Sequence, residues 1–133
     1  MVHQSLLPPG WPRPKGYSNG VLAKGAMIFT GGVVGWDTDE RFVGSDLGSQ
    51  FRQVLLNTLA ILQEGGAGPE HVVRMTWYVV DRDEYLRDLP AIGEAWKELF
   101  GRNFPAMAVV QVEALVEPGA RIEIETIAVM PEW

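Results

Sequence analysis

Cysteine is absent from this 133-residue chain, and histidine occurs only twice, as His3 and His71. Without cysteine, the chain has no disulfide bridges, no thiolate nucleophile and no zinc site built on thiolates. Two isolated imidazoles supply neither a catalytic triad nor a set of metal ligands, so we expect both histidines to have surface roles. The sequence therefore predicts a protein that works without a bound metal ion.

The chain also has little of what a membrane or a nucleic-acid partner requires. No apolar run reaches the roughly 18–20 residues of a transmembrane helix, and the first residues lack the basic and apolar regions of a secretory signal. We therefore expect a cytoplasmic protein. Seventeen acidic and eleven basic residues give a net charge of −6, and the basic residues are scattered. Because a nucleic-acid-binding surface is usually basic, a nucleic-acid partner and a ribonuclease activity are disfavoured.

Several common motifs for catalysis or phosphate binding are missing as well. The chain has no phosphate-binding loop ending in Gly-Lys-Ser/Thr, no Gly-x-Ser-x-Gly and no His-Glu-x-x-His. Gly31, Gly32 and Gly35 make a glycine-rich segment, but no helix begins directly after it, as a phosphate cradle would require. We expect a strand end with a bulge and a close backbone approach there, and no cofactor.

What the sequence does contain is the periodicity of a single α+β domain over residues 1–133. An arm rich in proline and glycine precedes the regular elements. The order of the elements is β-β-α-β-α-β-β, which predicts a mixed sheet with two helices on one face. They are expected at 21–23 and 26–30 (two strands about a Lys24-Gly25 turn), 46–64 (a helix capped by Asp46), 71–81 (a strand), 82–100 (a helix kinked or divided at Pro90), 106–113 and 121–130 (two strands).

The second face of this sheet is left without helices. Alternation within the strands gives it a half-apolar character, and such a face favours association into closed symmetric oligomers. The strand around Met75 and Trp77 is expected to point Val73, Met75, Trp77 and Val79 to one face and Arg74, Thr76 and Tyr78 to the other. The residues expected on the open face are Thr76, Tyr78, Val110, Val112, Ile127 and Val129.

The final strand carries the most unusual charged residue. Glu125 shares a face with Ile127 and Val129, in a strand that becomes apolar toward its end. A carboxylate in such a place either handles a proton or orients a water molecule, or it pairs with Arg74, Arg121 or a neighbouring subunit. Both interpretations stay open at this point. Two interpretations are also open for Tyr17: its phenol either enters a pocket or packs to anchor the arm.

Four segments of the sequence form a combined pattern, and they are 16–21, 27–30, 105–106 and 121–129. Together they resemble the Rid (YjgF/UK114) family of small homotrimeric proteins. The resemblance covers nearly the whole chain, and it implies a chorismate-mutase-like fold in which three subunits form a central barrel with three pockets at their boundaries. It also implies hydrolysis of reactive enamines or imines to a carbonyl compound and ammonia, without metal or organic cofactor; some members have been described as ribonucleases.

The resemblance also implies roles for individual residues. Tyr17 and Glu125 match the family's pocket tyrosine and its water-orienting glutamate. Met107 stands where an arginine usually clamps the substrate carboxylate, and a thioether cannot make that charge-assisted contact. The pocket is therefore expected to be more apolar than usual, with Arg74 or Arg121 as candidate replacements for the cation. Two further departures concern Gly31-Gly32, where Ser-Gly is frequent, and Gly93, where an asparagine is frequent.

Two functions follow as hypotheses. The first is a homotrimeric imine or enamine deaminase in which Glu125 and Tyr17 are catalytic and the substrate lies against Met107, Gly31, Gly32 and Gly93. The alternative is a trimer that binds a small ligand or a partner and has lost the chemistry. Release of ammonia from a panel of imines distinguishes the two.

Overall fold

A computed structural model describes residues 2–132, and its centre is a five-stranded mixed sheet. The central strand β7 runs antiparallel to β3, β4 and β5, whereas β5 and β6 are parallel. The path through the sheet is β3-β7-β5-β6, with β4 also paired to β7, so β6 lies at an edge. The strands are β3 (Gly25–Phe29), β4 (Val33–Val34), β5 (Val72–Val79), β6 (Ala106–Gln111) and β7 (Ile122–Pro131).

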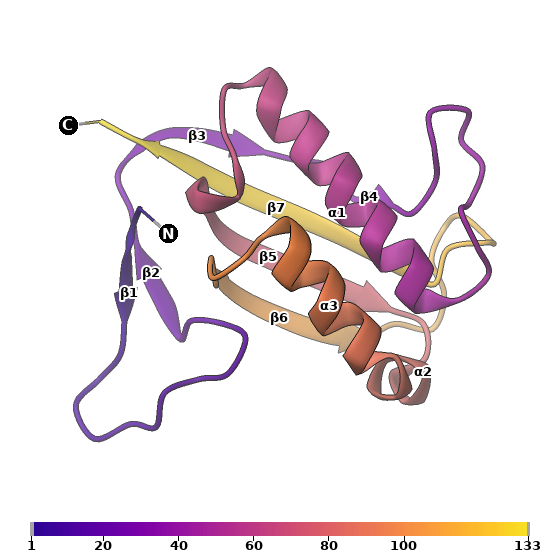
Figure 1. Ribbon diagram of the computed structural model, residues 1–133, viewed down its shortest axis with the longest axis horizontal. Coiled ribbons are helices and arrows are strands. Elements are labelled where there is room, and N and C mark those ends of the chain that lie inside the picture. Colours follow the sequence, from indigo (N-terminus) through magenta and orange to yellow (C-terminus); the bar gives the residue numbers. More distant parts are fainter. Residues whose placement is uncertain (1, 133) are drawn as a thin grey trace.

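Helices cover one face of this sheet, as predicted. The helices α1 (Leu47–Glu64) and α3 (Leu89–Leu99) lie side by side across it, and α2 (Arg82–Arg87) precedes α3 (Figure 1). The predicted N-cap is confirmed, because the Asp46 side chain accepts a hydrogen bond from the Ser49 amide. The predicted break near Pro90 is also confirmed, since Asp88 ends α2 and Pro90 lies in the first turn of α3. Within residues 2–132, none of the helices combines the length and apolar character that a bilayer crossing demands.

The alternation predicted for the last strand is confirmed. Ile122, Ile124, Thr126 and Ala128 are buried beneath the helices, while Glu125 is exposed on the other face. In β5 the predicted core residues Met75, Trp77 and Val79 are buried too, but the prediction for Val73 is wrong. A β-bulge between Val72 and Arg74 shifts the alternation there, so that Val72 is buried instead.

The N-terminal part differs most from the prediction. An unexpected strand, β1 (Gln4–Leu6), pairs with β2 (Gly20–Leu22) in a separate two-stranded sheet beside the main one (Figure 1). The expected pairing about Lys24-Gly25 is therefore wrong, because β3 pairs with β7. Gly25 makes that crossing possible: its φ is 151°, and a Cβ there would lie 1.8 Å from the Met130 carbonyl oxygen.

The N-terminal segment also corrects two predictions about burial. His3 is only 9% exposed and its Nε2 lies 2.6 Å from the Val129 carbonyl oxygen, so its predicted surface role is wrong. Val129, which we expected on the open face, is buried where this segment meets β7. The rest of that face is open, with Met27, Phe29 and Val110 exposed by 56%, 64% and 41%.

Candidate functional site

Glu125 lies in a shallow pocket on the open face of the sheet. The Oε1 atom of Glu125 accepts a hydrogen bond of 2.9 Å from the Tyr78 hydroxyl. Its second carboxylate oxygen makes no hydrogen bond to any other residue in 2–132. An exposed carboxylate with one oxygen held and the other free can receive a proton from a bound water molecule. The pocket has a volume of about 250 Å³ and is lined by Phe29, Thr30, Arg74, Thr76, Glu125, Thr126 and Ile127.

Tyr78 is a functional candidate that sequence reasoning placed on the correct face without assigning it a role. Glu125 stands opposite Thr76 in the β5–β7 register, so Tyr78 is its diagonal neighbour. The pKa of Tyr78 is raised above its ordinary value, chiefly because its hydroxyl donates to the Glu125 carboxylate, and ionising the phenol would place a second negative charge beside it. The alternation of β5 and β7, together with their register, would have been enough to find this pair.

Of the two arginines considered as substitutes for the missing cation, only Arg74 lies near Glu125. Arg74 lines the same pocket and takes part in no ion pair among residues 2–132. Arg121 is engaged elsewhere, since its Nε donates to Glu84 Oε1 at 2.9 Å. Arg121 is therefore a poor candidate for binding a substrate anion beside Glu125.

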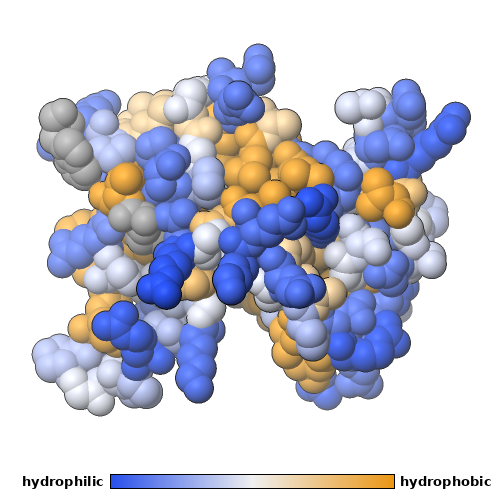
Figure 2. All heavy atoms as spheres, in the orientation of Figure 1, coloured by the Kyte–Doolittle hydropathy of each residue, from blue (hydrophilic) through white to orange (hydrophobic). Residues whose placement is uncertain are grey.

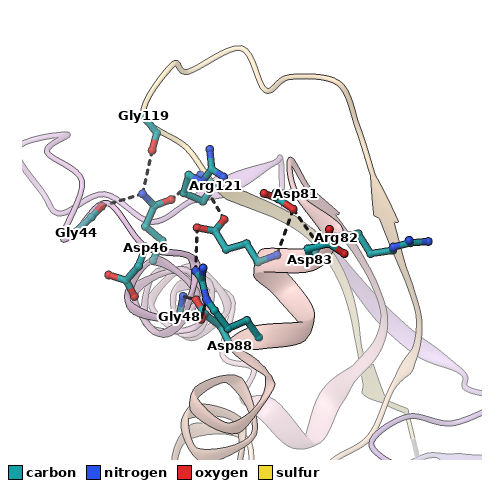
Figure 3. A network of polar contacts seen from close by, with 12 residues as sticks. Gly44, Asp46, Gly48, Asp81, Arg82, Asp83, Asp88, Gly119 and Arg121 are labelled. Carbon is teal, nitrogen blue, oxygen red and sulfur yellow. Dashed lines mark hydrogen bonds and ion pairs between the residues drawn. The ribbon is translucent and has the colours of Figure 1, made fainter.

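The surroundings of Arg121 form a structural network at the start of β7 (Figure 3). The buried side chain of Gln50 accepts a hydrogen bond of 2.7 Å from the Arg121 amide. Its Nε2 atom donates to the carbonyl oxygens of Gly44 and Gly119, both at 2.9 Å. A single residue of α1 thus connects two loops and the start of β7, which explains why a polar side chain is buried here.

A second and much larger cavity lies on the helix-covered side, between α3, β6 and the N-terminal arm. Figure 2 shows the surface hollowed between the arm and α3, with hydrophobic atoms along the α3 side. The cavity has a volume of about 920 Å³. Its lining residues are mostly apolar or aromatic and include Tyr17, Gly93 and Met107.

Three of the predicted site residues are therefore brought together, but Glu125 is not among them. Met107 stands opposite Met75 in the parallel β5–β6 pair and packs against the core, whereas Glu125 points to the opposite side of the sheet. Tyr17 is 42% exposed and is held near β6 because the next residue, Ser18, donates its amide proton to the Pro105 carbonyl at 3.0 Å. Within one chain, the proposed base and the rest of the predicted pocket lie on different faces.

The glycine-rich segment lies in neither cavity. Gly31 and Gly32 follow Thr30, which lines the Glu125 pocket, but neither glycine lines it. A Cβ on Gly32 would lie 2.3 Å from a Glu123 carboxylate oxygen, and one on Gly35 would lie 2.6 Å from the Gln50 carbonyl oxygen. The predicted close backbone approach is thus confirmed at Gly35, whereas Gly32 lies against the Glu123 side chain and a Cβ on Gly31 would meet no atom within 4 Å. Among residues 2–132, no group of three or more histidine, aspartate or glutamate side chains could share a metal ion.

Comparisons of sequence add an independent finding. A model of the Endoribonuclease L-PSP family matches residues 12–130. This range contains the predicted site residues of both cavities. A RutC family protein of Pyrococcus abyssi is 34% identical over 118 residues, which are 88% of this chain and 89% of that protein. The human 2-iminobutanoate/2-iminopropanoate deaminase is 34% identical over 114 residues, covering 85% of this chain and 79% of the human protein.

Solved structures resemble the fold as a whole. A Rid-family protein of unknown function from Yersinia pestis superposes with a TM-score of 0.84 at 31% identity, covering 98% of this chain and 100% of its own. A Mycobacterium tuberculosis protein of the YjgF/YER057c/UK114 family gives a TM-score of 0.66 at 31% identity, covering 86% and 87%. The two-layer arrangement of the sheet and its helices is thus shared with these proteins.

Proposed function

From the premise that this chain belongs to the Rid (YjgF/YER057c/UK114) family, we propose that it is a deaminase of reactive imines or enamines. A relative that is 34% identical is named as a deaminase of 2-iminobutanoate and 2-iminopropanoate. In this chain, the observation that carries the proposal is Glu125, exposed in a pocket with one oxygen held by Tyr78 and the other free. The reaction needs neither metal nor organic cofactor, and the expected location is the cytoplasm.

The proposed chemistry uses Glu125 as a general base. The nitrogen of the C=N bond is protonated, and a water oxygen attacks the carbon while Glu125 takes one proton of the water, which gives a neutral carbinolamine. Glu125 then gives this proton to the nitrogen. The C–N bond breaks, ammonia leaves with the bonding electron pair, and the hydroxyl proton passes to the Glu125 carboxylate as the carbonyl group forms. Glu125 finally releases this proton to ammonia, which leaves the base ready for the next turnover. Because Tyr78 donates to Oε1, it acts as a positioning residue that leaves the other oxygen for water. General base catalysis of this kind contributes typically about 10²–10⁴-fold in rate.

We further propose that the site is completed in a homotrimer. Glu125 and the cavity of Tyr17, Gly93 and Met107 lie on opposite faces within one chain, so a second subunit must bring them together. Exposed apolar side chains beside Glu125, such as Phe29 at 64%, support burial of this face against another subunit. In the assembly, Tyr17 and backbone groups near Met107 would hold the substrate, and the backbone of Gly31-Gly32 would border it on the Glu125 side.

The deaminase proposal is tested by supplying the enamine 2-aminoacrylate, generated in situ from serine by a dehydratase, and a panel of imines, generated in situ by an amino-acid oxidase, and by measuring the release of ammonia. We expect the wild type to accelerate release and Glu125→Gln to lower the rate by about 10²–10⁴-fold. Glu123→Gln is the matched control, because Glu123 lies on the same strand and face but does not line the pocket. Wild-type release no faster than that of buffer or of Glu125→Gln across the panel would overturn the proposal.

The assembly is tested separately by light scattering. We expect the mass of three subunits, and a monomer at micromolar concentration would contradict the shared site.

The alternative function, a trimer that binds a small ligand without turning it over, is favoured by one observation. The large cavity presents Met107 where the resembled family has a substrate-binding arginine, and no carboxylate lines it. Under this alternative, a ligand binds in the cavity while Glu125→Gln changes neither its affinity nor any release of ammonia.

A further inference from the structure

The cavity on the helix-covered side is larger than a three- or four-carbon imine requires. Its volume of about 920 Å³ is near the upper end of small-molecule sites, which span roughly 300–1,000 Å³. The space is lined largely by aromatic rings, so its interior suits a flat apolar group. These rings belong to Tyr17, Trp77, Tyr85, Trp96 and Phe104.

The two tryptophans in its wall are fixed by packing. Trp77 and Trp96 are 4% and 7% exposed, and their ring centroids lie 6.0 Å apart. Trp77 also packs against Phe51 at 4.8 Å, and Trp96 stacks on Phe100 at 4.4 Å. Because these contacts hold the indoles in place before any ligand arrives, the cavity is preorganised for an aromatic ring.

The same two tryptophans carry unused hydrogen-bond donors. The Nε1 atoms of Trp77 and Trp96 are buried and have no acceptor among residues 2–132. A buried donor without a partner is unfavourable. Because both nitrogen atoms have almost no accessible surface, a ligand in the cavity contacts the faces and edges of these rings rather than their N–H groups.

The charged residues of the cavity are all positive. Lys15, Lys97 and Arg102 line it, whereas no aspartate or glutamate within residues 2–132 does. All three are exposed, and none takes part in an ion pair among residues 2–132. In a chain of net charge −6, this grouping of unpaired cations favours an anion at the solvent side of the cavity. The ligand is thus apolar at one end and anionic at the other.

We infer that this cavity selects α-imino acids with a large aromatic side chain, and this inference rests on the proposed function. The ring lies against Trp77 and Trp96, and the carboxylate lies among the cations. The C=N carbon is bonded directly to the carboxylate carbon, so it stays near the solvent side, where Glu125 of a neighbouring subunit would reach it. Water then converts the C=N bond to C=O and releases ammonia, giving an aryl keto acid. A reaction that oxidises an aromatic amino acid must supply the substrate.

Binding is measured first, because it does not depend on catalysis. Phenylpyruvate and 2-oxobutanoate, the keto acids of an aromatic and a small imine, are titrated into the full chain by calorimetry. We expect phenylpyruvate to bind at least about tenfold more tightly, a difference of about 1.4 kcal/mol. The indole N–H signals of Trp77 and Trp96, assigned with Trp77→Phe and Trp96→Phe, should shift in the NMR spectrum. Equal affinities, or unmoved indole signals, would overturn the inference.

Turnover then separates this inference from the proposed function. Imines are generated from phenylalanine and from 2-aminobutyrate by an amino-acid oxidase, and kcat/KM should favour the aromatic imine by about tenfold or more. Hydrolysis of both imines without that preference contradicts the aromatic cavity while the deaminase proposal stands. Tight phenylpyruvate binding without hydrolysis of any imine supports the aromatic cavity and contradicts the deaminase.

Two variants locate the effect in the cavity. A Cβ on Gly93 would meet no atom within 4 Å, so Gly93→Phe should fold and block the ring, with Glu94→Phe on the same helix as its matched control. Lys97→Gln combined with Arg102→Gln should weaken phenylpyruvate binding about tenfold, and Arg82→Gln, an exposed arginine outside the cavity, should not. Unchanged affinity in Gly93→Phe, or equal losses in variant and control, would place the ligand elsewhere.

Discussion

The open face and the helix-covered face of the sheet carry different kinds of side chains around their cavities. On the open face, Glu125 and Tyr78 form a polar pair beside Arg74 in a small pocket. On the covered face, the larger cavity has aromatic walls, three cations and no carboxylate. Neighbouring residues of one strand serve both sides, since Ile124 supports the core and Glu125 faces outward. Under the proposed function, the group for proton transfer and the groups for recognition lie too far apart within one chain and come together only between two subunits of the proposed trimer.

Apolar truncations on the two faces should give the largest difference. Ile124 is fully buried, so Ile124→Ala should lower the free energy of unfolding by about 2–5 kcal/mol at every protein concentration. Phe29 is 64% exposed, so Phe29→Ala should act through assembly, and its effect should grow as the protein is diluted. Urea unfolding at two concentrations measures both. A loss for Phe29→Ala that does not depend on concentration would mean that the open face is not an interface.

Restoring a cation inside the aromatic cavity should reverse its preference. Met107 lines the cavity and packs against the core. Met107→Arg should therefore shift the ratio of kcat/KM values about tenfold toward small carboxylate-bearing imines, about 1.4 kcal/mol in transition-state binding. Met107→Leu keeps the apolar character and should leave the ratio nearly unchanged. A Met107→Arg variant that is folded and has an unaltered ratio would show that this strand does not determine specificity.

The helix cap that orients α1 should have a smaller effect, and it should depend on pH. Removing the cap in Asp46→Ala should cost about 1 kcal/mol near neutral pH, and solvent screening keeps the electrostatic part small. The pKa of Asp46 is lowered below its ordinary value of 3.8, first by the hydrogen bond from the Ser49 amide. Its stabilisation is thus present above pH 3.8 and is lost as the pH falls through the lowered pKa.

Urea unfolding between neutral and acid pH measures this effect. Asp46→Asn keeps a capping oxygen without titrating, so its difference from Asp46→Ala should stay constant with pH. If the difference in the free energy of unfolding between the wild type and Asp46→Ala grew as the pH fell, the assignment of an ionised Asp46 as the helix cap would be wrong.

The smallest expected effect concerns the positioning of Glu125. Tyr78→Phe removes the hydroxyl that holds Oε1, and we expect kcat to fall only about threefold, because the base itself remains.

The titration of Tyr78 tests the same pair of side chains. In Glu125→Gln, the raised pKa of Tyr78 should fall back toward 10.0, because the hydrogen bond to the Glu125 carboxylate is the largest cause of the rise. Absorbance of tyrosinate follows this titration, with Tyr78→Phe identifying the signal. An unshifted titration in Glu125→Gln would show that the two side chains do not interact.

Much of the fold could be predicted because strong local patterns determine it. The apolar stripes of α1 and α3, the Asp46 cap and the break before Pro90 are all local features, and each is confirmed. The errors concern which strands pair with one another rather than which segments form strands or helices. The short segment 21–23 could not reveal that β2 pairs with β1 and that β3 crosses to β7, because strands of a few residues do not specify their neighbours.

The site was predictable to a different degree on each face. The alternation of residues in the last strand was enough to place Glu125 on the open face. That face was expected to be open because both predicted helices pack on the other face of the sheet. The resemblance led to an apolar pocket with Tyr17, Gly93 and Met107, but the tryptophans of its wall were not predicted, because Trp77 and Trp96 come from segments far apart in the chain. The bulge near Val72 also lay beyond reach, since one extra residue in a strand leaves no distinct pattern in the sequence.

The placement of Gly93 on α3 and of Met107 on β6, away from the strand that carries Glu125, has an evolutionary consequence. Under the proposed function, substitutions at these two positions would change the space for the substrate without contacting the proposed base, Glu125, or the Tyr78 hydroxyl that donates to it. On that proposal, a single mutation at either position would change the preferred size of the substrate while the hydrolysis itself is retained, so related sequences that differ there would differ in specificity rather than in reaction.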